Sequence, residues 1–253
     1  MNFPKDIFYD LYDKLISKGG KPISLKHLSK TKKKYLIKNS VSIPINTDSP
    51  FYLLSRILFP NCCPESLIIQ NLKKDVLKYM NISEFHDLLT ETEIIQYPKS
   101  YDNSKKYTKF ITIQNRQVYP KKRKGQFRIL ANGRELLEAL SKEVKPNVLV
   151  RLVDTGRMTI NEQISLIQKT DYFIGIHGAG LSLILFAKKN TILHEIRRSS
   201  ENRLLLYMSA FSNHKYYSDY VENVKKHEDN EFIYFNVNRF VETVKKRLEE
   251  NGF

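Results

Sequence analysis

The sequence is poor in the features that mark disulfide scaffolds, structural metal sites and membrane spans. Its 253 residues include 2 cysteines, which are adjacent at Cys62 and Cys63. Two neighbouring cysteines cannot hold a structural zinc without further ligands, and no C-x-x-C occurs. No run approaches the roughly 18 apolar residues that a membrane span needs. We therefore expect free thiols, with a disulfide to another chain as the alternative, and no membrane span in this chain.

The two ends of the sequence also lack targeting features. The opening MNFPKDIFYDLYDKL is amphipathic and charged, and it has no apolar core of a secretory signal. The last residues, EENGF, are no retention signal. These observations keep a cytoplasmic location open.

Acidic residues are fewer than basic ones. The chain has 27 Asp and Glu against 42 Lys and Arg, and its formal net charge is +15. Such a balance favours anionic partners: nucleic acid, acidic membrane or phosphorylated small molecules. The lysines are dispersed, however, which favours solvated faces. The run KKRK at 121–124 predicts an exposed loop, with a nucleic-acid patch as the alternative. No aromatic or zinc-ligand pattern accompanies it, so we expect no nucleic-acid partner.

The chain after residue 103 alternates between expected strands and expected helices. Strands are expected at 109–114, 147–154, 172–176, 190–196 and 214–221. Helices are expected at 132–143, 158–170, 202–212 and 238–252, the second of them with a capping box of Thr159 and Glu162. This order predicts an α/β fold with a parallel sheet and helices on both faces. Residues 1–103 have short, broken apolar segments, so we separate an irregular region at 1–103 from a domain at 104–253.

The segment DYFIGIHGAGLSLILF at 171–186 is apolar except for a glycine-rich centre. It predicts a buried strand, a tight turn and a helix. Glycine permits positive φ and close approach to the main chain. A helix begins with N–H groups that have no internal partner, which is a ready site for a phosphate. The alternative is a tight connection in which His177 caps or packs. The spacing is not G-x-G-x-x-G, so a dinucleotide site is not supported.

Four blocks between about residues 108 and 200 resemble the family 61 glycosyltransferases. They are RILANGREL at 128–136, EQI at 162–164, TDYFIGIHGAGL at 170–181 and the strand that reaches Glu195. Their common order and spacing are more specific than any one block. Within the family, the chain is similar to protein O-linked N-acetylglucosamine transferases.

This resemblance implies a GT-B fold, in which two Rossmann-like domains meet and the C-terminal one holds the nucleotide sugar. Residues 104–253 would be that C-terminal domain, and residues 1–103 an incomplete remnant of the N-terminal one. The implied reaction is inverting and needs no metal or other cofactor. It moves a sugar from a UDP-sugar to a Ser or Thr hydroxyl of a protein or to a glycan. The expected sugar is N-acetylglucosamine, and xylose and arabinose are the alternatives. The implied compartment is the endoplasmic reticulum lumen or the Golgi.

The diphosphate that leaves in such a reaction gains negative charge, which helix N-termini and positive side chains can stabilise. We therefore predict a donor site in which Glu195 accepts hydrogen bonds from ribose hydroxyls and His177 is also the candidate catalytic residue. The predicted binding residues are Arg116, Arg128, His177, Gly178, Ala179, Gly180, Leu181 and Glu195. The family has its two arginines close together, whereas QVYPKKRKGQF separates Arg116 from Arg128 here, so Arg123 is a rival to Arg116. Because residues 1–103 are short for a full acceptor domain, a non-catalytic nucleotide-sugar-binding protein is the alternative function.

Overall fold

The computed structural model describes residues 67–80, 94–116, 128–198, 203–221, 223–227 and 230–253. Several predicted features lie outside the described residues. These are the Cys62–Cys63 pair, the KKRK run at 121–124 and Arg123.

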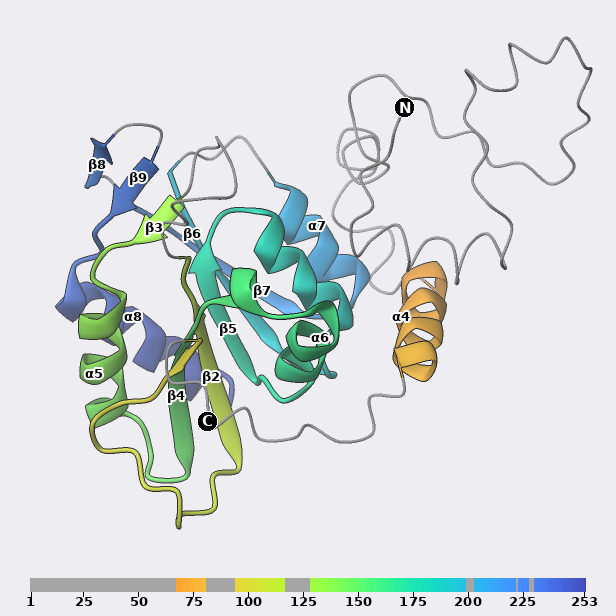
Figure 1. Cartoon of the computed structure of the whole chain (residues 1–253), viewed down its shortest axis with the longest axis horizontal. Helices are drawn as coiled ribbons and strands as arrows, with labels where there is room; N and C mark the ends of the chain where they lie inside the picture. Colours follow the sequence, from red (N-terminus) through yellow and green to blue (C-terminus); the bar gives the residue numbers. More distant parts are fainter. Residues whose placement is uncertain (1–66, 81–93, 117–127, 199–202, 222, 228–229) are drawn as a thin grey trace, which may run out of the picture.

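A six-stranded sheet forms the centre of the described domain (Figure 1). Its strands are β1 (Ile95–Gln96), β2 (Lys109–Gln114), β4 (Val148–Val153), β5 (Tyr172–Ile176), β6 (Ile192–Arg197) and β7 (Lys215–Tyr220). The spatial order is β1-β4-β2-β5-β6-β7, and all pairs are parallel except β1 with β4. Strands β4 and β6 are buried at every position, as expected for a sheet covered on both faces. The predicted parallel sheet is confirmed.

The strand order also locates where a ligand is expected to bind. Counted along the chain, the five parallel strands lie in the order 2-1-3-4-5, which is one of the two common orders of doubly wound sheets. The direction of strand addition reverses between β2 and β5. In such sheets ligands bind at this switch point, beyond the carboxyl ends of the strands.

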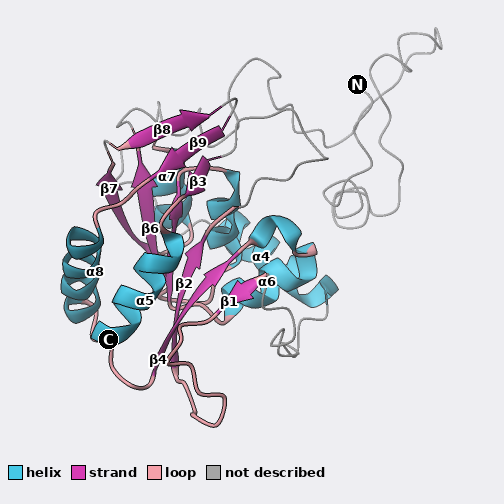
Figure 2. Cartoon of the chain, turned by 60° about the vertical axis from the view of Figure 1, so that its left-hand side comes forward, coloured by secondary structure: helices cyan, strands magenta, loops and turns pink. Residues whose placement is uncertain are grey.

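Helices cover both faces of the sheet, as the sequence predicted (Figures 1 and 2). On one face lie α5 (Gly133–Glu143) and α8 (Val237–Glu250), whose Leu136, Leu140, Phe240 and Val244 join one core with the sheet. The other face carries α6 (Ile160–Gln168), the 3₁₀ helix η2 (Ala179–Phe186) and α7 (Leu204–Phe211), and α4 (Leu67–Met80) contacts η2. Each fully buried leucine or phenylalanine contributes about 1.5–3 kcal/mol to this packing.

A small second sheet, which the sequence did not predict, lies near the carboxyl edge of the main one (Figure 2). It contains β3 (Arg128–Leu130), β9 (Asn230–Ile233) and β8 (Val224–His227), with β3 parallel to β9. The side-chain amide of Asn115 joins it to the end of β2. That amide donates to the Leu130 carbonyl and accepts from the Leu130 N–H, each at 2.9 Å. Asn115 thereby replaces a strand partner and fixes β3 beside the switch point.

Two details refine the expectations. The segment after the glycines is helical as expected, but it is a 3₁₀ helix of 8 residues. The main sheet also includes β1, which precedes residue 104. The described residues hold one Rossmann-like α/β unit, and the two-domain GT-B arrangement and the division at residue 103 stay predictions.

Candidate functional site

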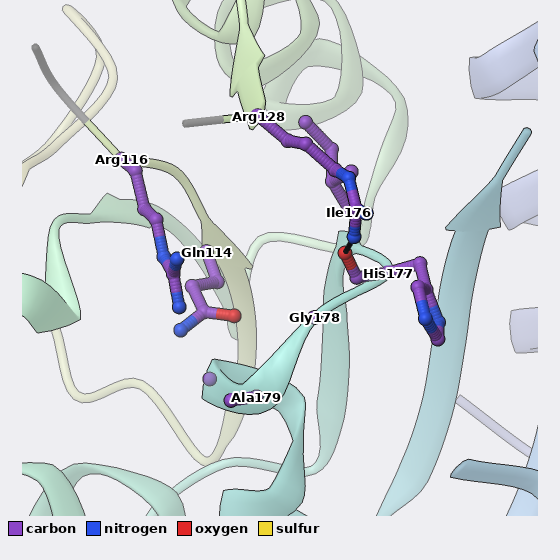
Figure 3. A pocket seen from close by; sticks show the side chains of 8 residues that line it. Gln114, Arg116, Arg128, Ile176, His177, Gly178 and Ala179 are labelled. Atoms are coloured by element: carbon purple, nitrogen blue, oxygen red, sulfur yellow. Dashed lines mark hydrogen bonds between the residues drawn. The ribbon is translucent and has the colours of Figure 1, made fainter. Parts of the chain in front are cut away.

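A pocket of about 250 Å³ lies at the switch point between β2 and β5 (Figure 3). The end of β2, the start of β3 and the turn after β5 form its walls. The residues that line it are Gln114, Arg116, Arg128, Ile176, His177, Gly178, Ala179 and Gly180. Six of the eight predicted binding residues therefore meet here, although they come from three segments of the chain.

The turn after β5 presents bare backbone to this pocket. The first hydrogen bond of η2 runs from the Leu181 N–H to the Gly178 carbonyl at 3.1 Å. The N–H groups of Ala179 and Gly180 precede that bond and have no acceptor among the described residues. Two N–H groups that precede the first helical hydrogen bond can bind an anion such as a phosphate oxygen. Leu181 does not fit its predicted role as a binding residue. Its N–H donates to the Gly178 carbonyl, and its side chain is fully buried in the core.

The three glycines of this segment serve different purposes. A Cβ on Gly180 would lie 2.2 Å from Nε2 of Gln114, and a Cβ on Gly175 would lie 2.8 Å from Cδ2 of Leu181. At these two positions a side chain would force Gln114 or Leu181 to shift. A Cβ on Gly178 would meet only the Ile176 carbonyl oxygen, at 3.8 Å. The backbone of Gly178 is extended (φ 164°, ψ 172°), so this turn does not use the left-handed conformation that glycine permits.

Gln114 is a site residue that the sequence analysis missed. It ends β2, is 5% exposed, lines the pocket and donates a hydrogen bond to the Thr155 hydroxyl. Its amide also fills the space that a side chain on Gly180 would need. A polar residue at the end of an otherwise apolar strand was the signal that could have identified it.

The two predicted arginines both reach the pocket but are held differently. Arg128 donates from Nη1 to the His177 carbonyl at 2.7 Å, and its Nε lies 3.6 Å from Oε2 of Glu231 on β9. It therefore clamps the glycine turn to the small sheet. The guanidinium of Arg116 lies beside Gln114 (Figure 3) and has no hydrogen-bond partner among the described residues. Arg116 is thus the arginine that can bind a ligand without first giving up a contact.

His177 and Glu195 lie differently from the predicted arrangement. The His177 imidazole points away from Gln114 and Arg116, and its Nδ1 is hydrogen bonded to Oε1 of Glu195 (Figure 3). Glu195 is fully buried, does not line the pocket and accepts a second hydrogen bond from the Tyr216 hydroxyl.

Burial and the neighbouring Glu195 carboxylate raise the pKa of Tyr216, so this hydroxyl remains a donor at neutral pH. Glu195 thus lies buried behind His177 and does not line the pocket, and its predicted contact with a ribose stays a prediction.

The described residues contain no group of three or more His, Cys, Asp or Glu side chains that could hold a metal ion. Among the described helices, none is both long enough and apolar enough to cross a membrane. Metal independence itself stays a prediction.

Two comparisons with known proteins indicate the family of this chain. The family model described as Glycosyltransferase 61 matches residues 8–194, which include the switch point and the glycine turn. The chain is also similar to an EGF domain-specific O-linked N-acetylglucosamine transferase of Xenopus laevis, with 32% identity over 96 residues. That match covers 37% of this chain and 18% of the relative, so the chain spans far less than the whole relative.

Proposed function

This chain belongs to the glycosyltransferase 61 family, and we propose that its switch-point pocket binds the diphosphate of a UDP-sugar whose sugar is transferred to an acceptor hydroxyl. The observation that carries the proposal is the meeting, at one edge of a parallel sheet, of two N–H groups and an arginine that have no hydrogen-bond partner among the described residues. Both kinds of group bind phosphate oxygens. The family is one of transferases, which supplies the reaction class.

The proposed reaction is a single displacement. The acceptor hydroxyl oxygen forms a bond to the anomeric carbon while the bond from that carbon to the β-phosphate oxygen breaks. The electron pair of the broken bond stays on the diphosphate, and the hydroxyl proton passes to a base. Attack from the opposite face inverts the configuration at the anomeric carbon.

In this proposal the pocket acts on the leaving group. The Ala179 and Gly180 N–H groups and the Arg116 guanidinium are aimed at the diphosphate, whose charge grows as the bond breaks. Donors that are fixed before the reaction stabilise such charge without reorganising, which is usually the largest contribution to catalysis. Arg128 holds the turn in place through the His177 carbonyl and can add a second positive charge.

The finer assignments follow the named relative. An O-linked N-acetylglucosamine transferase uses an N-acetylglucosamine donor and a hydroxyl acceptor, so we propose UDP-N-acetylglucosamine as donor and a protein Ser or Thr hydroxyl, or a glycan, as acceptor. UDP-xylose and UDP-arabinose are the alternative donors. We propose the endoplasmic reticulum lumen or the Golgi as the compartment, with the cytoplasm as the alternative.

One observation supports a second candidate, a protein that binds a nucleotide sugar without transferring it. The described lining of the pocket contains no carboxylate, and the His177 imidazole points away from Gln114 and Arg116. A base for the acceptor hydroxyl is therefore not among these lining side chains. The binding half of the reaction is better supported than the transfer half.

A thermal-shift screen with UDP, UDP-N-acetylglucosamine, UDP-xylose and GDP-sugars tests the binding half. A ligand at about 100 times its dissociation constant stabilises the folded state by roughly 2.7 kcal/mol. We expect UDP and one UDP-sugar to raise the melting temperature and GDP-sugars to leave it unchanged. Release of UDP in the presence of an acceptor then separates transfer from binding. Absence of any shift with every UDP ligand would refute the proposal.

A further inference from the structure

A second pocket, of about 630 Å³, opens at the opposite, amino-terminal edge of the main sheet. Residues at the starts of four neighbouring parallel strands line it: Lys109 of β2, Asp171 before β5, Ile192 of β6 and Lys215 of β7. The glycine turn lies beyond the carboxyl ends of the same strands. This second pocket is therefore separate from the candidate donor site, and its test does not depend on UDP binding.

Basic side chains predominate in the second pocket. Lys109, Lys188, Lys189 and Lys215 line it, and Asp171 is the one carboxylate side chain among the lining residues. Among the side chains, four positive charges and one negative charge leave a net +3, and the terminal carboxylate of Phe253, which also lines the pocket, lowers this to +2. Like charges gathered around a concave surface repel one another and attract anions, because the surrounding protein focuses their field. We call this set of residues, together with His214, the lysine pocket.

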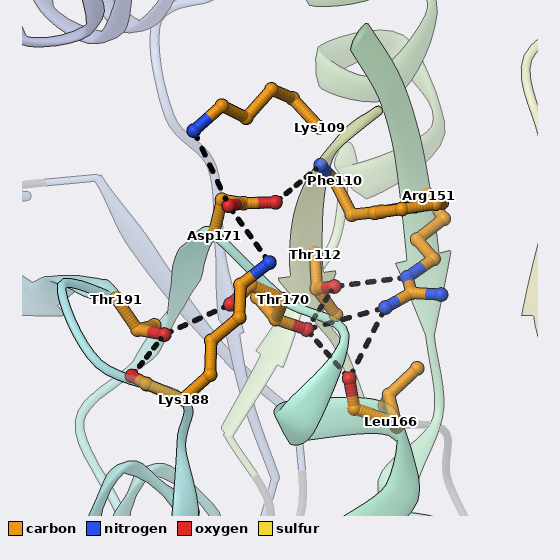
Figure 4. Close-up of polar contacts among 9 residues, drawn as sticks. All are labelled: Lys109, Phe110, Thr112, Arg151, Leu166, Thr170, Asp171, Lys188 and Thr191. Atoms are coloured by element: carbon orange, nitrogen blue, oxygen red, sulfur yellow. Dashed lines mark hydrogen bonds and ion pairs between the residues drawn. The ribbon is translucent and has the colours of Figure 1, made fainter. Parts of the chain in front are cut away.

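The one carboxylate side chain of the lysine pocket is already fully engaged (Figure 4). Its Oδ1 lies 2.8 Å from Nζ of Lys188 and 3.6 Å from Nζ of Lys109. Its Oδ2 accepts the Phe110 N–H at 2.9 Å. Lys215 donates to the neutral amide oxygen of Asn251 at 2.5 Å. Asp171 thus neutralises only part of the pocket's charge, and most of it faces solvent.

A buried histidine, His214, also lines the pocket and is 8% exposed. Both of its ring nitrogens are buried and face the Thr191 and Ile184 carbonyls. The ring therefore lies beside the lysines and reports on changes in the pocket, while the ammonium groups supply the contacts with a ligand.

We propose that the lysine pocket binds a compact anion that carries two or more phosphate groups. Ammonium groups from three segments, around Lys109, Lys188 and Lys215, can each donate charge-assisted hydrogen bonds to phosphate oxygens. The volume is within the range of about 300–1,000 Å³ that small-molecule sites occupy. A single phosphate can contact only part of a set of four ammonium groups on three segments, so a diphosphate or a longer chain fits the pocket better.

Calorimetric titration with pyrophosphate at low ionic strength tests the proposal. It is carried out on the full chain with Arg116→Gln, because the proposed donor site also binds a diphosphate and this change weakens it. The Lys188→Gln/Lys215→Gln double variant removes two of the four ammonium groups, and we expect binding to weaken at least about tenfold, since charge-assisted hydrogen bonds are the stronger class. The matched control is Lys142→Gln/Lys246→Gln, which removes the same charge from exposed positions of α5 and α8. We expect this control to bind as the Arg116→Gln protein does.

Further arms identify the source of the phosphate and guard against misfolding. Tripolyphosphate represents free polyphosphate, and UDP represents a nucleotide source. Loss of affinity in the pocket variant, in either arm, supports the site. An NMR titration of the wild-type His214 ring with pyrophosphate needs no variant to fold, and a shift that saturates supports the site as well. Absence of binding, or equal weakening in the pocket variant and the matched control, overturns the proposal.

Discussion

Replacing Gly178 by valine distinguishes a glycine that is needed for the fold from one that is needed for a ligand. The backbone at this position is extended, and an added Cβ would meet only the Ile176 carbonyl oxygen at 3.8 Å. A Cβ here therefore neither strains the backbone nor strikes a neighbour. We expect the free energy of unfolding to change by no more than about 0.5 kcal/mol, as at other tolerant surface positions.

The effect of this change on UDP binding should be much larger. Gly178 lines the pocket and lies beside the two unpaired N–H groups of Ala179 and Gly180. An isopropyl group at this point would occupy the space that a phosphate oxygen needs. Loss of one charge-assisted hydrogen bond costs about 1.5–3 kcal/mol. Since 1.4 kcal/mol is about a factor of ten, we expect UDP affinity to fall between about tenfold and 100-fold.

The assay is calorimetric titration with UDP, with folding checked by circular dichroism and thermal melting. Gly178→Ala should give a smaller loss of affinity, because its side chain is shorter. Gly180→Ala is the contrasting variant: its Cβ would lie 2.2 Å from Nε2 of Gln114, so we expect a lower melting temperature. A folded Gly178→Val protein that binds UDP with wild-type affinity would refute the donor-site interpretation of the turn.

Three further outcomes follow from the same contacts. Arg116→Gln should weaken UDP binding without lowering the melting temperature. Arg128→Ala should lower both the UDP affinity and the melting temperature, because it removes the clamp on the turn. Calorimetry and thermal melting distinguish the two variants, and Lys142→Ala at an exposed position is the control. UDP binding should be unchanged in EDTA, because the positive charge at the site comes from the protein. A loss of UDP binding in EDTA that magnesium or manganese restores would contradict metal independence. Burial and the charge of Lys73 lower the pKa of His214 to about 4 from an unfolded value of about 6.5. The folded state therefore binds fewer protons, and its stability is complete above pH 6.5 and falls by up to about 3 kcal/mol as the pH drops toward 4. Denaturant unfolding of His214→Gln should lack this component, and an identical pH dependence in both proteins would exclude it.

The sequence predicted the main sheet well because the signal for it is local. Buried parallel strands are short apolar runs, and the helices between them show a 3.6-residue pattern or a cap such as Thr159 with Glu162. The small sheet was missed for the opposite reason. Its strand β3 has only 3 residues and is held by the side chain of Asn115 and by β9, which is about a hundred residues away.

The sequence predicted which residues meet at the candidate site, but it did not predict where the side chains of His177 and Glu195 lie. The motif and the arginines were recognisable from residue types and order, and the pocket contains them. The positions of His177 and Glu195 depend on the register of β5 against β6, which pairs Gly175 with Glu195. That pairing places the carboxylate under the turn, in contact with Tyr216 of the next strand. No pattern within one segment could reveal a contact that three strands define.

The buried Glu195 explains how the turn keeps its shape although none of its residues has a left-handed backbone conformation. His177 is held at its side chain by Glu195, at its N–H by the Ile196 carbonyl at 2.8 Å and at its carbonyl by Arg128 at 2.7 Å. A residue fixed at these three points fixes the direction in which the chain leaves β5. Gln114, packed against Gly180, fixes the next bend. The N–H groups of Ala179 and Gly180 are thereby set before any ligand arrives, which is the condition under which fixed dipoles stabilise a developing charge most effectively. In this fold a histidine, a buried carboxylate and a glutamine hold the turn in shape, and Gly178 lines the pocket with open space where a side chain would stand.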